Sequence, residues 1–252
     1  MVFTRSFASF LLVRGFVVPL VVVALTSAAV ATVPTKLVTR QAVGEPARVD
    51  GCAGARACSE WVHYPATPSR TVIETGFSRS RAHFYVWSKA DGAPRDLDIF
   101  VTPGGGDGPA RSSGHVVPGF GGELRWLEGE RLWHWWGCGT ACVMAKLYDA
   151  TGAVRHAETG SWAEVAPDAR RVLVLDYGGS VVLIDAITLA RFASGPIPGA
   201  GFPDEVSWSA AGVRVVFIEA IGQPRTRSIV VTCVPATAGK LDCQRAPDAL
   251  HR

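Results

Sequence analysis

The sequence predicts an all-β protein, and three observations carry this prediction. First, an apolar anchor, a polar turn and two β runs recur as a unit four times along the chain. Second, if Phe84, Leu132, Val172 and Val215 are equivalent positions, the unit repeats at spacings of 48, 40 and 43 residues, the period of a four-stranded propeller blade. Third, no long stretch keeps helical periodicity with proper caps. We therefore expect a small β-propeller-like domain of about four antiparallel blades over residues 71–252.

The first 31 residues are predicted to be an export signal. Arg5 and Arg14 supply a positive start, residues 16–25 are apolar, and Ala29-Val30-Ala31 offers a small-x-small cleavage site after Ala31. The alternative is an uncleaved N-terminal membrane anchor, because the largely apolar stretch of residues 16–33 approaches the length that spans a bilayer. With cleavage we expect a periplasmic or secreted protein that keeps no membrane segment.

Residues 32–70 show few paired β signals and contain four prolines. We expect this segment to be an extended, irregular N-terminal arm rather than a separate domain. Two of the six cysteines, Cys52 and Cys58, lie within it and would tether the arm to itself.

The six cysteines all follow the predicted signal, and an even number in an exported chain indicates disulfides. They come as three close pairs, so we expect three local bridges. The main alternative is a non-local pairing such as Cys52 with Cys243. The expected pairs are Cys52–Cys58, Cys138–Cys142 and Cys233–Cys243.

From residue 71 onward, β runs alternate with turns rich in Gly, Asp and Thr. The glycine-rich insert of residues 102–114 lengthens the first spacing and is predicted to be a flexible surface loop, since no helix follows it to form a phosphate site. The predicted β runs are residues 71–76, 83–88, 97–102, 124–127, 132–136, 143–148, 163–166, 172–176, 181–184, 205–208, 213–219 and 228–233.

Two resemblances can be stated on these residues. The pattern Trp-Ser-x-x-Gly-x-x-Val-Val-Phe at residues 208–217, with weaker echoes at Phe77, Trp126 and Val165, resembles the repeat of periplasmic TolB-like and WD40-like β-propellers. Residues 126–154 are similar to uncharacterised exported bacterial proteins that share a Gly-Cys-Gly-Thr-x-Cys turn. The first resemblance implies the propeller-like fold. The second implies no activity, because that group has none assigned.

The densest candidate for a site is the aromatic run Trp133, His134, Trp135 and Trp136. Side chains on a strand point alternately to opposite faces, so these four residues cannot share one face. In one interpretation, one pair packs in the core and the other stacks between adjacent blades. In the other, the exposed pair is an aromatic platform that binds a sugar ring, a peptide or a partner protein.

No catalytic or metal signature stands out. A metal site at His134, Cys138 and Cys142 lacks a fourth ligand, and export favours oxidation of both thiols, so no metal is predicted. Asp96 and Asp98 share a strand face, but solvation at a strand end explains them better than acid–base catalysis. Removal of two signal arginines changes the formal charge from +3 to +1, which gives no basis for nucleic-acid binding.

The sequence therefore predicts an exported bacterial protein that is a non-catalytic binding or protein-interaction module of the cell envelope. Its expected partner is an unknown envelope protein or a small ligand, and no cofactor is expected. The alternatives are a structural or assembly protein, or an inhibitor of the immunity type. A small exported hydrolase with an unrecognised site is the least favoured class.

Overall fold

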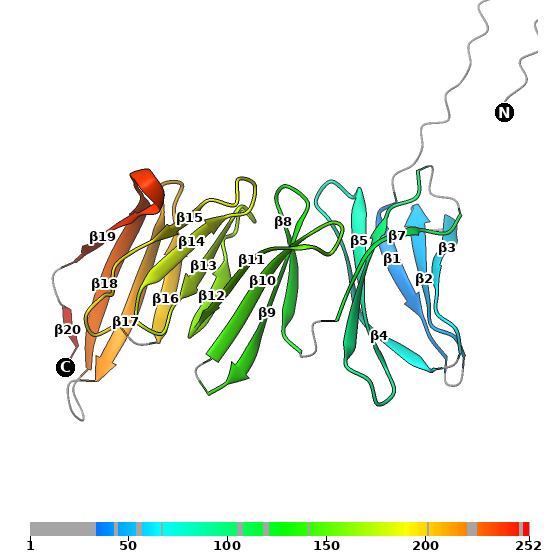
Figure 1. The fold of residues 1–252 in the computed structure, drawn as a ribbon, viewed down its shortest axis with the longest axis horizontal. Helices are drawn as coiled ribbons and strands as arrows, with labels where there is room; N and C mark the ends of the chain where they lie inside the picture. The colour runs from blue at the N-terminus through cyan, green and yellow to red at the C-terminus, as the bar shows by residue number, and fades with distance from the viewer. Residues whose placement is uncertain are drawn as a thin grey trace, which may run out of the picture. The chain divides into compact units, whose positions relative to one another are not determined.

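The chain is all-β, as predicted (Figure 1). The computed structural model describes residues 34–42, 45–53, 57–66, 68–104, 108–117, 121–140, 142–200, 202–220, 226–246 and 249–251. The predicted export signal lies outside these residues and stays a prediction. Within the described part, no helix has the length and apolar character needed to cross a membrane.

Five antiparallel sheets follow one another along the chain, and we number them in that order. The first sheet contains β1 (Lys36–Arg40), β2 (Arg48–Ala53) and β3 (Ala57–His63). The second contains β4 (Arg70–Phe77), β5 (His83–Ala90), β6 (Arg95–Val101) and β7 (Arg111–Val116). The third contains β8 (Glu123–Leu127), β9 (Arg131–Gly139), β10 (Cys142–Asp149) and β11 (Val154–Gly160).

The last two sheets continue the same up-and-down order. The fourth contains β12 (Trp162–Val165), β13 (Arg171–Leu175), β14 (Val181–Asp185) and β15 (Arg191–Ala193). The fifth contains β16 (Pro203–Trp208), β17 (Val213–Ala220), β18 (Thr226–Pro235) and β19 (Leu241–Arg245), with β20 (Ala249–His251) also paired to β18. A short 3-10 turn, η1 (Thr237–Gly239), precedes β19.

The four predicted equivalent positions are confirmed as equivalent. Phe84, Leu132, Val172 and Val215 each lie on the second strand of their sheet, and each is fully buried. Each also packs against the sheet that precedes its own in the chain. In the described residues, the four core clusters therefore join successive sheets: first to second, second to third, third to fourth and fourth to fifth.

The expectation of an irregular arm over residues 32–70 needs correction, because this segment forms the first sheet. Its core residues Val49 and Trp61 pack against Phe84 of the second sheet, and the rings of Trp61 and Phe84 lie 5.4 Å apart. Polar residues interrupt the alternation of apolar and polar residues along β2 and β3, so the sequence of this segment shows only a weak strand pattern. The buried face nevertheless removes a large aromatic side chain from water, and this burial orders the segment.

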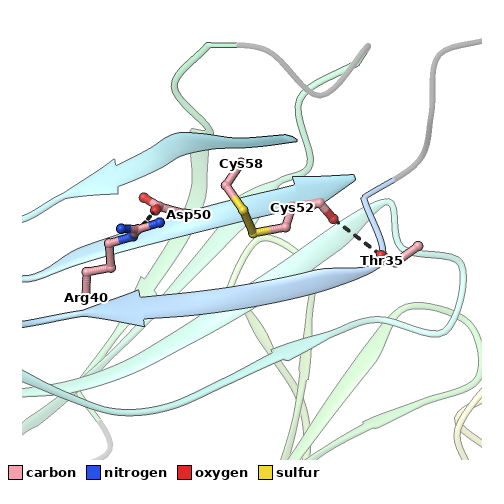
Figure 2. Close-up of a disulfide and its surroundings, with 5 residues drawn as sticks. All are labelled: Thr35, Arg40, Asp50, Cys52 and Cys58. Carbon is pink, nitrogen blue, oxygen red and sulfur yellow. Dashed lines mark hydrogen bonds and ion pairs between the residues drawn. A yellow bond between two sulfur atoms is a disulfide. The ribbon is translucent and has the colours of Figure 1, made fainter. Parts of the chain in front are cut away.

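Figure 2 shows how the strands of the first sheet are tied together. Cys52 and Cys58 lie directly opposite each other on β2 and β3 and form a disulfide. On the other side of β2, the Arg40 side chain of β1 donates to the Asp50 carboxylate at 2.6 Å. The hydroxyl of Thr35 donates to the Cys52 carbonyl at 3.4 Å. These contacts fix the order of the three strands.

The fourth strands of the second, third and fourth sheets, β7, β11 and β15, were not among the predicted β runs. β7 begins near the end of the insert that the sequence predicts to be a loop and extends beyond it to Val116. β7 and β11 contain mostly exposed or half-buried polar residues, because each pairs with a neighbour on one side only. An edge strand of this kind carries a weak apolar alternation.

The three local disulfides are confirmed, and no described cysteine is free. Cys138 and Cys142 bridge the hairpin between β9 and β10, and Cys233 and Cys243 are paired residues of β18 and β19. The bridges differ in accessibility. In two of them one cysteine is buried: Cys52 is paired with the exposed Cys58, and Cys233 is paired with the half-buried Cys243. The third joins the exposed Cys138 to the half-buried Cys142.

We expect a mild reductant to open the Cys138–Cys142 bridge first, because a thiol must reach the disulfide sulfur to attack it and this is the bridge that contains no buried cysteine. Alkylation followed by peptide mass mapping should label these two cysteines while the other four remain unlabelled. A double Cys138→Ala, Cys142→Ala variant should lose about 2 kcal/mol of unfolding free energy, since the closed loop is short. Labelling of Cys233 before Cys138 would contradict this order.

Candidate functional site

The aromatic run on β9 divides between the two faces of the third sheet. Trp133 points toward the fourth sheet, where it joins the core cluster formed with β12, β13 and β14, and Trp135 packs partly buried against that cluster. His134 and Trp136 are buried on the opposite face, toward Trp87 of the second sheet. The structure thus does not bring all four residues into one site.

The face that contains Trp133 and Trp135 lines a cavity of about 300 Å³ between the third and fourth sheets. The cavity lies along β8 and β12, which are both edge strands of their sheets. Trp162 on β12 adds a third indole, and it is 38% exposed. The remaining lining residues are Glu123, Arg125, Ala163, Glu164 and Val165.

The cavity also contains polar groups that the fold does not use. Glu123 and Arg125 lie on the same face of β8, opposite Trp135 and Trp133 respectively. Neither forms an ion pair or a side-chain hydrogen bond with any other residue that the structure describes. The indole N–H of Trp133 is fully buried and likewise lacks a partner among the described residues. Glu164 differs, because its Oε1 accepts a hydrogen bond from Trp208 Nε1 at 3.0 Å.

The Trp133 Nε1 atom is fully buried, so a ligand in the cavity cannot reach this N–H. A ligand would instead contact the indole rings of Trp135 and Trp162. It would also find the exposed carboxylate of Glu123 and the exposed guanidinium of Arg125, which have no partner among the described residues. We take this cavity, with Trp133, Trp135, Trp162, Glu123, Arg125 and Glu164, as the candidate site and call it the indole cavity.

On the opposite face of the third sheet, aromatic rings and cations alternate. The His134 ring stacks on Trp136 at 4.6 Å and meets Trp87 edge-on at 5.9 Å. The Lys146 ammonium lies over Trp136 and the Arg95 guanidinium lies over Trp87, as in cation–π pairs. Both ring nitrogens of His134 lack a hydrogen-bond partner among the described residues.

This environment keeps His134 neutral. Burial is the main cause that lowers its pKa, to about 4, because a charged imidazolium would lose its hydration. The Gly121 backbone opposes the shift without reaching hydrogen-bond geometry, and the nearby charges of Lys146 and Arg95 reinforce it. His134 and Trp136 therefore form packing between sheets and do not line the indole cavity.

Asp96 and Asp98 share a face of β6, as predicted, and every carboxylate there has a partner. Arg70 donates to Asp96 at 2.5 Å, and Tyr64 donates to Asp98 at 2.8 Å. His115 Nδ1 lies 2.7 Å from Asp98. Burial, followed by the Asp98 charge, raises the pKa of Tyr64. The network fastens Tyr64, at the end of the first sheet, to the second sheet, which is a structural role.

Ser80, His83 and Glu130 also meet, where the turn between the first two strands of the second sheet lies against the corresponding turn of the third sheet. Ser80 donates to one Glu130 oxygen at 2.6 Å, and His83 Nδ1 lies 2.8 Å from the other. Burial alone would raise the pKa of Glu130, but these hydrogen bonds outweigh it and lower the pKa. In a nucleophilic triad the hydroxyl would donate to the imidazole. Here the hydroxyl and the imidazole both bind the carboxylate instead, so the arrangement joins two turns.

Metal ligation is not supported by the described residues, which contain no group of three His, Cys, Asp or Glu side chains placed to hold an ion. Cys138 and Cys142 are joined in a disulfide and have no thiolates to offer.

Two other cavities are less suited to a specific ligand. One, of about 350 Å³, is lined by the Gly195–Pro198 loop and by β18 and β19. The other, of about 190 Å³, lies beneath the exposed rings of Tyr177 and Phe202. Neither is lined by a tryptophan. The indole cavity combines aromatic surface with unused polar groups, and for that reason we prefer it.

Sequence reasoning found Trp133 and Trp135 but missed the other half of the indole cavity. Trp162, Glu164, Glu123 and Arg125 were not singled out, because they are scattered over two short strands. The available signal was the alternation of polar and apolar residues along β8, in which Glu123 and Arg125 are polar. In the folded sheet these two residues pair with Trp135 and Trp133 of β9. Such register is not visible before the strands are paired.

Comparison with known proteins gives no closer assignment. No family model and no curated protein matches the chain. Similar solved structures include one from a study of two prolyl endopeptidases, at 18% identity and a TM-score of 0.44, covering 85% of this chain and 33% of that one. The C-terminal WD40 domain of Sif2 is 10% identical with a TM-score of 0.42, covering 80% and 64%.

A third structure is the uncharacterized protein lmo1340 from Listeria monocytogenes EGD-e, at 10% identity and a TM-score of 0.43, covering 87% of this chain and 80% of that one. The chain spans about a third of the first structure's length and 64% of the second's. These likenesses are too weak to carry an argument about function.

Proposed function

We propose that the protein is a non-catalytic binding module of the bacterial cell envelope and that it binds its ligand in the indole cavity. The observation that carries the proposal is the combination of the Trp135 and Trp162 indoles with the Glu123 carboxylate and the Arg125 guanidinium around about 300 Å³ of space, both charged groups being without a partner among the described residues. Concave aromatic sites with a few convergent polar groups are typical of ligand binding.

The envelope location is supported by the cysteines and by the predicted signal. Three disulfides fit an oxidising compartment, since cytosolic thiols are kept reduced. The export signal ending at Ala31 would deliver the chain there. A periplasmic or secreted protein is the location that agrees with both observations.

A binding role agrees better than catalysis with the way titratable groups are used. The carboxylates that meet His83 and His115 are held by contacts that join sheets: Glu130 of the third sheet by His83 of the second, and Asp98 of the second sheet by Tyr64, next to the first. In the indole cavity, no imidazole or hydroxyl side chain lies among the lining residues, and of its two carboxylates Glu164 already accepts a hydrogen bond from Trp208 Nε1.

The proposal is tested by comparing binding of the exported protein with that of two cavity variants, Trp135→Ala and Trp162→Ala. The purified protein is immobilised and incubated with fractions of its own cell envelope, separated into soluble protein, cell-wall polymer and membrane. Each variant should retain at least about tenfold less material than the unaltered protein, since tryptophans that become buried on binding contribute much of the binding free energy.

Tyr177→Ala is the matched control, because Tyr177 is a more exposed aromatic residue that lines a different cavity. It should retain as much material as the unaltered protein. Equal retention by all three variants and the unaltered protein would show that the indole cavity does not bind the ligand. Circular dichroism of each variant excludes misfolding as the cause of a loss.

A further inference from the structure

We propose that the ligand of the indole cavity is a neutral saccharide, an inference that rests on the binding function proposed above. It is drawn from three properties of the lining: the type of apolar surface, the balance of charge and the size of the space.

The apolar surface of the cavity is largely aromatic. Trp135 is half-buried and Trp162 is 38% exposed, so both indoles keep accessible surface, while Trp133 is fully buried behind them. A pyranose ring has a flat face of C–H groups that covers an indole well, and its hydroxyls remain at the edge, free to bind polar groups. Rigid amphipathic rings therefore suit both halves of this ligand.

The unpaired polar groups of the cavity have both signs. Glu123 can only accept hydrogen bonds when ionised, whereas Arg125 can only donate. A hydroxyl both donates and accepts, so neighbouring sugar hydroxyls can satisfy both groups. An anionic ligand would face Glu123 and Glu164, and a cationic ligand would face Arg125. A neutral ligand rich in hydroxyls meets none of these repulsions.

The size of the cavity restricts the ligand. About 300 Å³ lies at the lower end of the range for small-molecule sites. The site can thus hold a short stretch of a saccharide chain, and it is too small for a folded partner domain.

The test is a titration of the purified full protein, as it is exported, with five probes. Three are neutral tetrasaccharides: α-1,4-linked glucose, β-1,4-linked glucose and β-1,4-linked N-acetylglucosamine. The fourth is anionic tetragalacturonate and the fifth is cationic tetralysine. Tryptophan fluorescence and calorimetry report binding. At least one neutral tetrasaccharide should bind with a dissociation constant below about 1 mM and change the indole emission.

The variants separate the cavity from the rest of the surface. Trp162→Ala and Glu123→Gln should each weaken binding of that tetrasaccharide about tenfold or more, as expected for loss of a central contact. Arg125→Gln should weaken it as well. Tyr177→Ala should leave the dissociation constant unchanged.

Binding of tetralysine or tetragalacturonate in preference to every neutral probe would overturn the inference, as would the absence of binding by all five. Either result leaves the proposed function standing if Trp135→Ala and Trp162→Ala still lose material from the envelope fractions. If Trp135→Ala and Trp162→Ala bind both the tetrasaccharide and the envelope material as strongly as the unaltered protein does, both proposals are wrong.

Discussion

On acidification from pH 6.5 to pH 4, the free energy of unfolding should fall by about 3 kcal/mol through His134 alone. The folded protein holds the pKa of this buried imidazole at about 4, whereas it is 6.5 in the unfolded chain. The unfolded state therefore takes up a proton that the folded state refuses. The neutral form is favoured by folding, so this contribution is fully present above pH 6.5 and declines as the pH falls toward 4. At about 1.4 kcal/mol per pKa unit, the shift gives the stated magnitude.

The measurement is urea-induced unfolding at pH 7, 6, 5 and 4 of the unaltered protein and of His134→Phe, which keeps a flat ring against Trp136. The difference in unfolding free energy between the two should change with pH in favour of the variant as the solution becomes acidic. His63→Gln is the matched control, since the His63 side chain is 52% exposed and its neighbour Glu60 is also exposed.

Titration of the Asp149 carboxylate does not obscure this result, because it affects stability at a lower pH than titration of His134 does. Burial would raise the pKa of Asp149, but hydrogen bonds from Thr151 and Arg155 dominate and lower it from 3.8 to about 2. Its contribution is therefore lost below about pH 4 and is the same in both proteins. Parallel pH curves for the unaltered protein and His134→Phe between pH 6.5 and 4 would refute the account of His134.

Replacement of Gly51 by alanine should destabilise the protein by about 3 kcal/mol, the upper end for overpacking of a core. Gly51 lies on β2 where the Trp61 indole crosses the backbone, and an added Cβ would come within 2.1 Å of the ring. The ring has little room to move, because Trp61 is 2% exposed and contacts both Phe77 and Phe84. The strain would fall on the contact between the first and second sheets.

Chemical denaturation with near-ultraviolet circular dichroism measures this effect through the tryptophan signal. Gly104→Ala is the control, because a Cβ at that position meets no atom within 4 Å. In the Trp61→Leu background, Gly51→Ala should cost much less unfolding free energy than it does in the unaltered protein, since the indole with which the Cβ clashes is absent. If Gly51→Ala proved as stable as Gly104→Ala, the packing of Trp61 on β2 would be wrong.

The strands of the repeat could be predicted where two-sided burial makes them apolar. β5, β9, β13 and β17 are second strands with a neighbour on each side, and their sequences are strongly apolar. The outer strands β7 and β11 escaped prediction because one edge and part of one face meet water. The local disulfides were predictable because short spacing and turn geometry restrict the pairing.

The first sheet escaped prediction, although the repeat itself held a clue. Leu132, Val172 and Val215 each pack against the sheet before their own, and Phe84 occupies the same position in the first repeat. A fully buried Phe84 requires an earlier sheet to cover it, and residues 36–63 supply that sheet. The prolines of this segment, read as signs of an irregular arm, lie outside β1, β2 and β3.

The site could be predicted only in half. The alternation rule separated Trp133 and Trp135 from His134 and Trp136, and the structure places the two pairs on opposite faces of the third sheet. The pairing of β8 with β9 and the approach of β12 are long-range contacts. They bring Arg125 and Trp162 to the cavity, and no local pattern encodes them.

The succession of core clusters has a consequence for motion. When each sheet is stabilised chiefly by its neighbours in the chain, unfolding free energy behaves as a sum of unit and interface contributions along one dimension. The third sheet has a core cluster on both faces, whereas each terminal sheet shares in one. Amide exchange should accordingly be slowest at the middle of the array and fastest at its ends. The indole cavity borders the third sheet, so its walls would stay folded while the terminal sheets open and close.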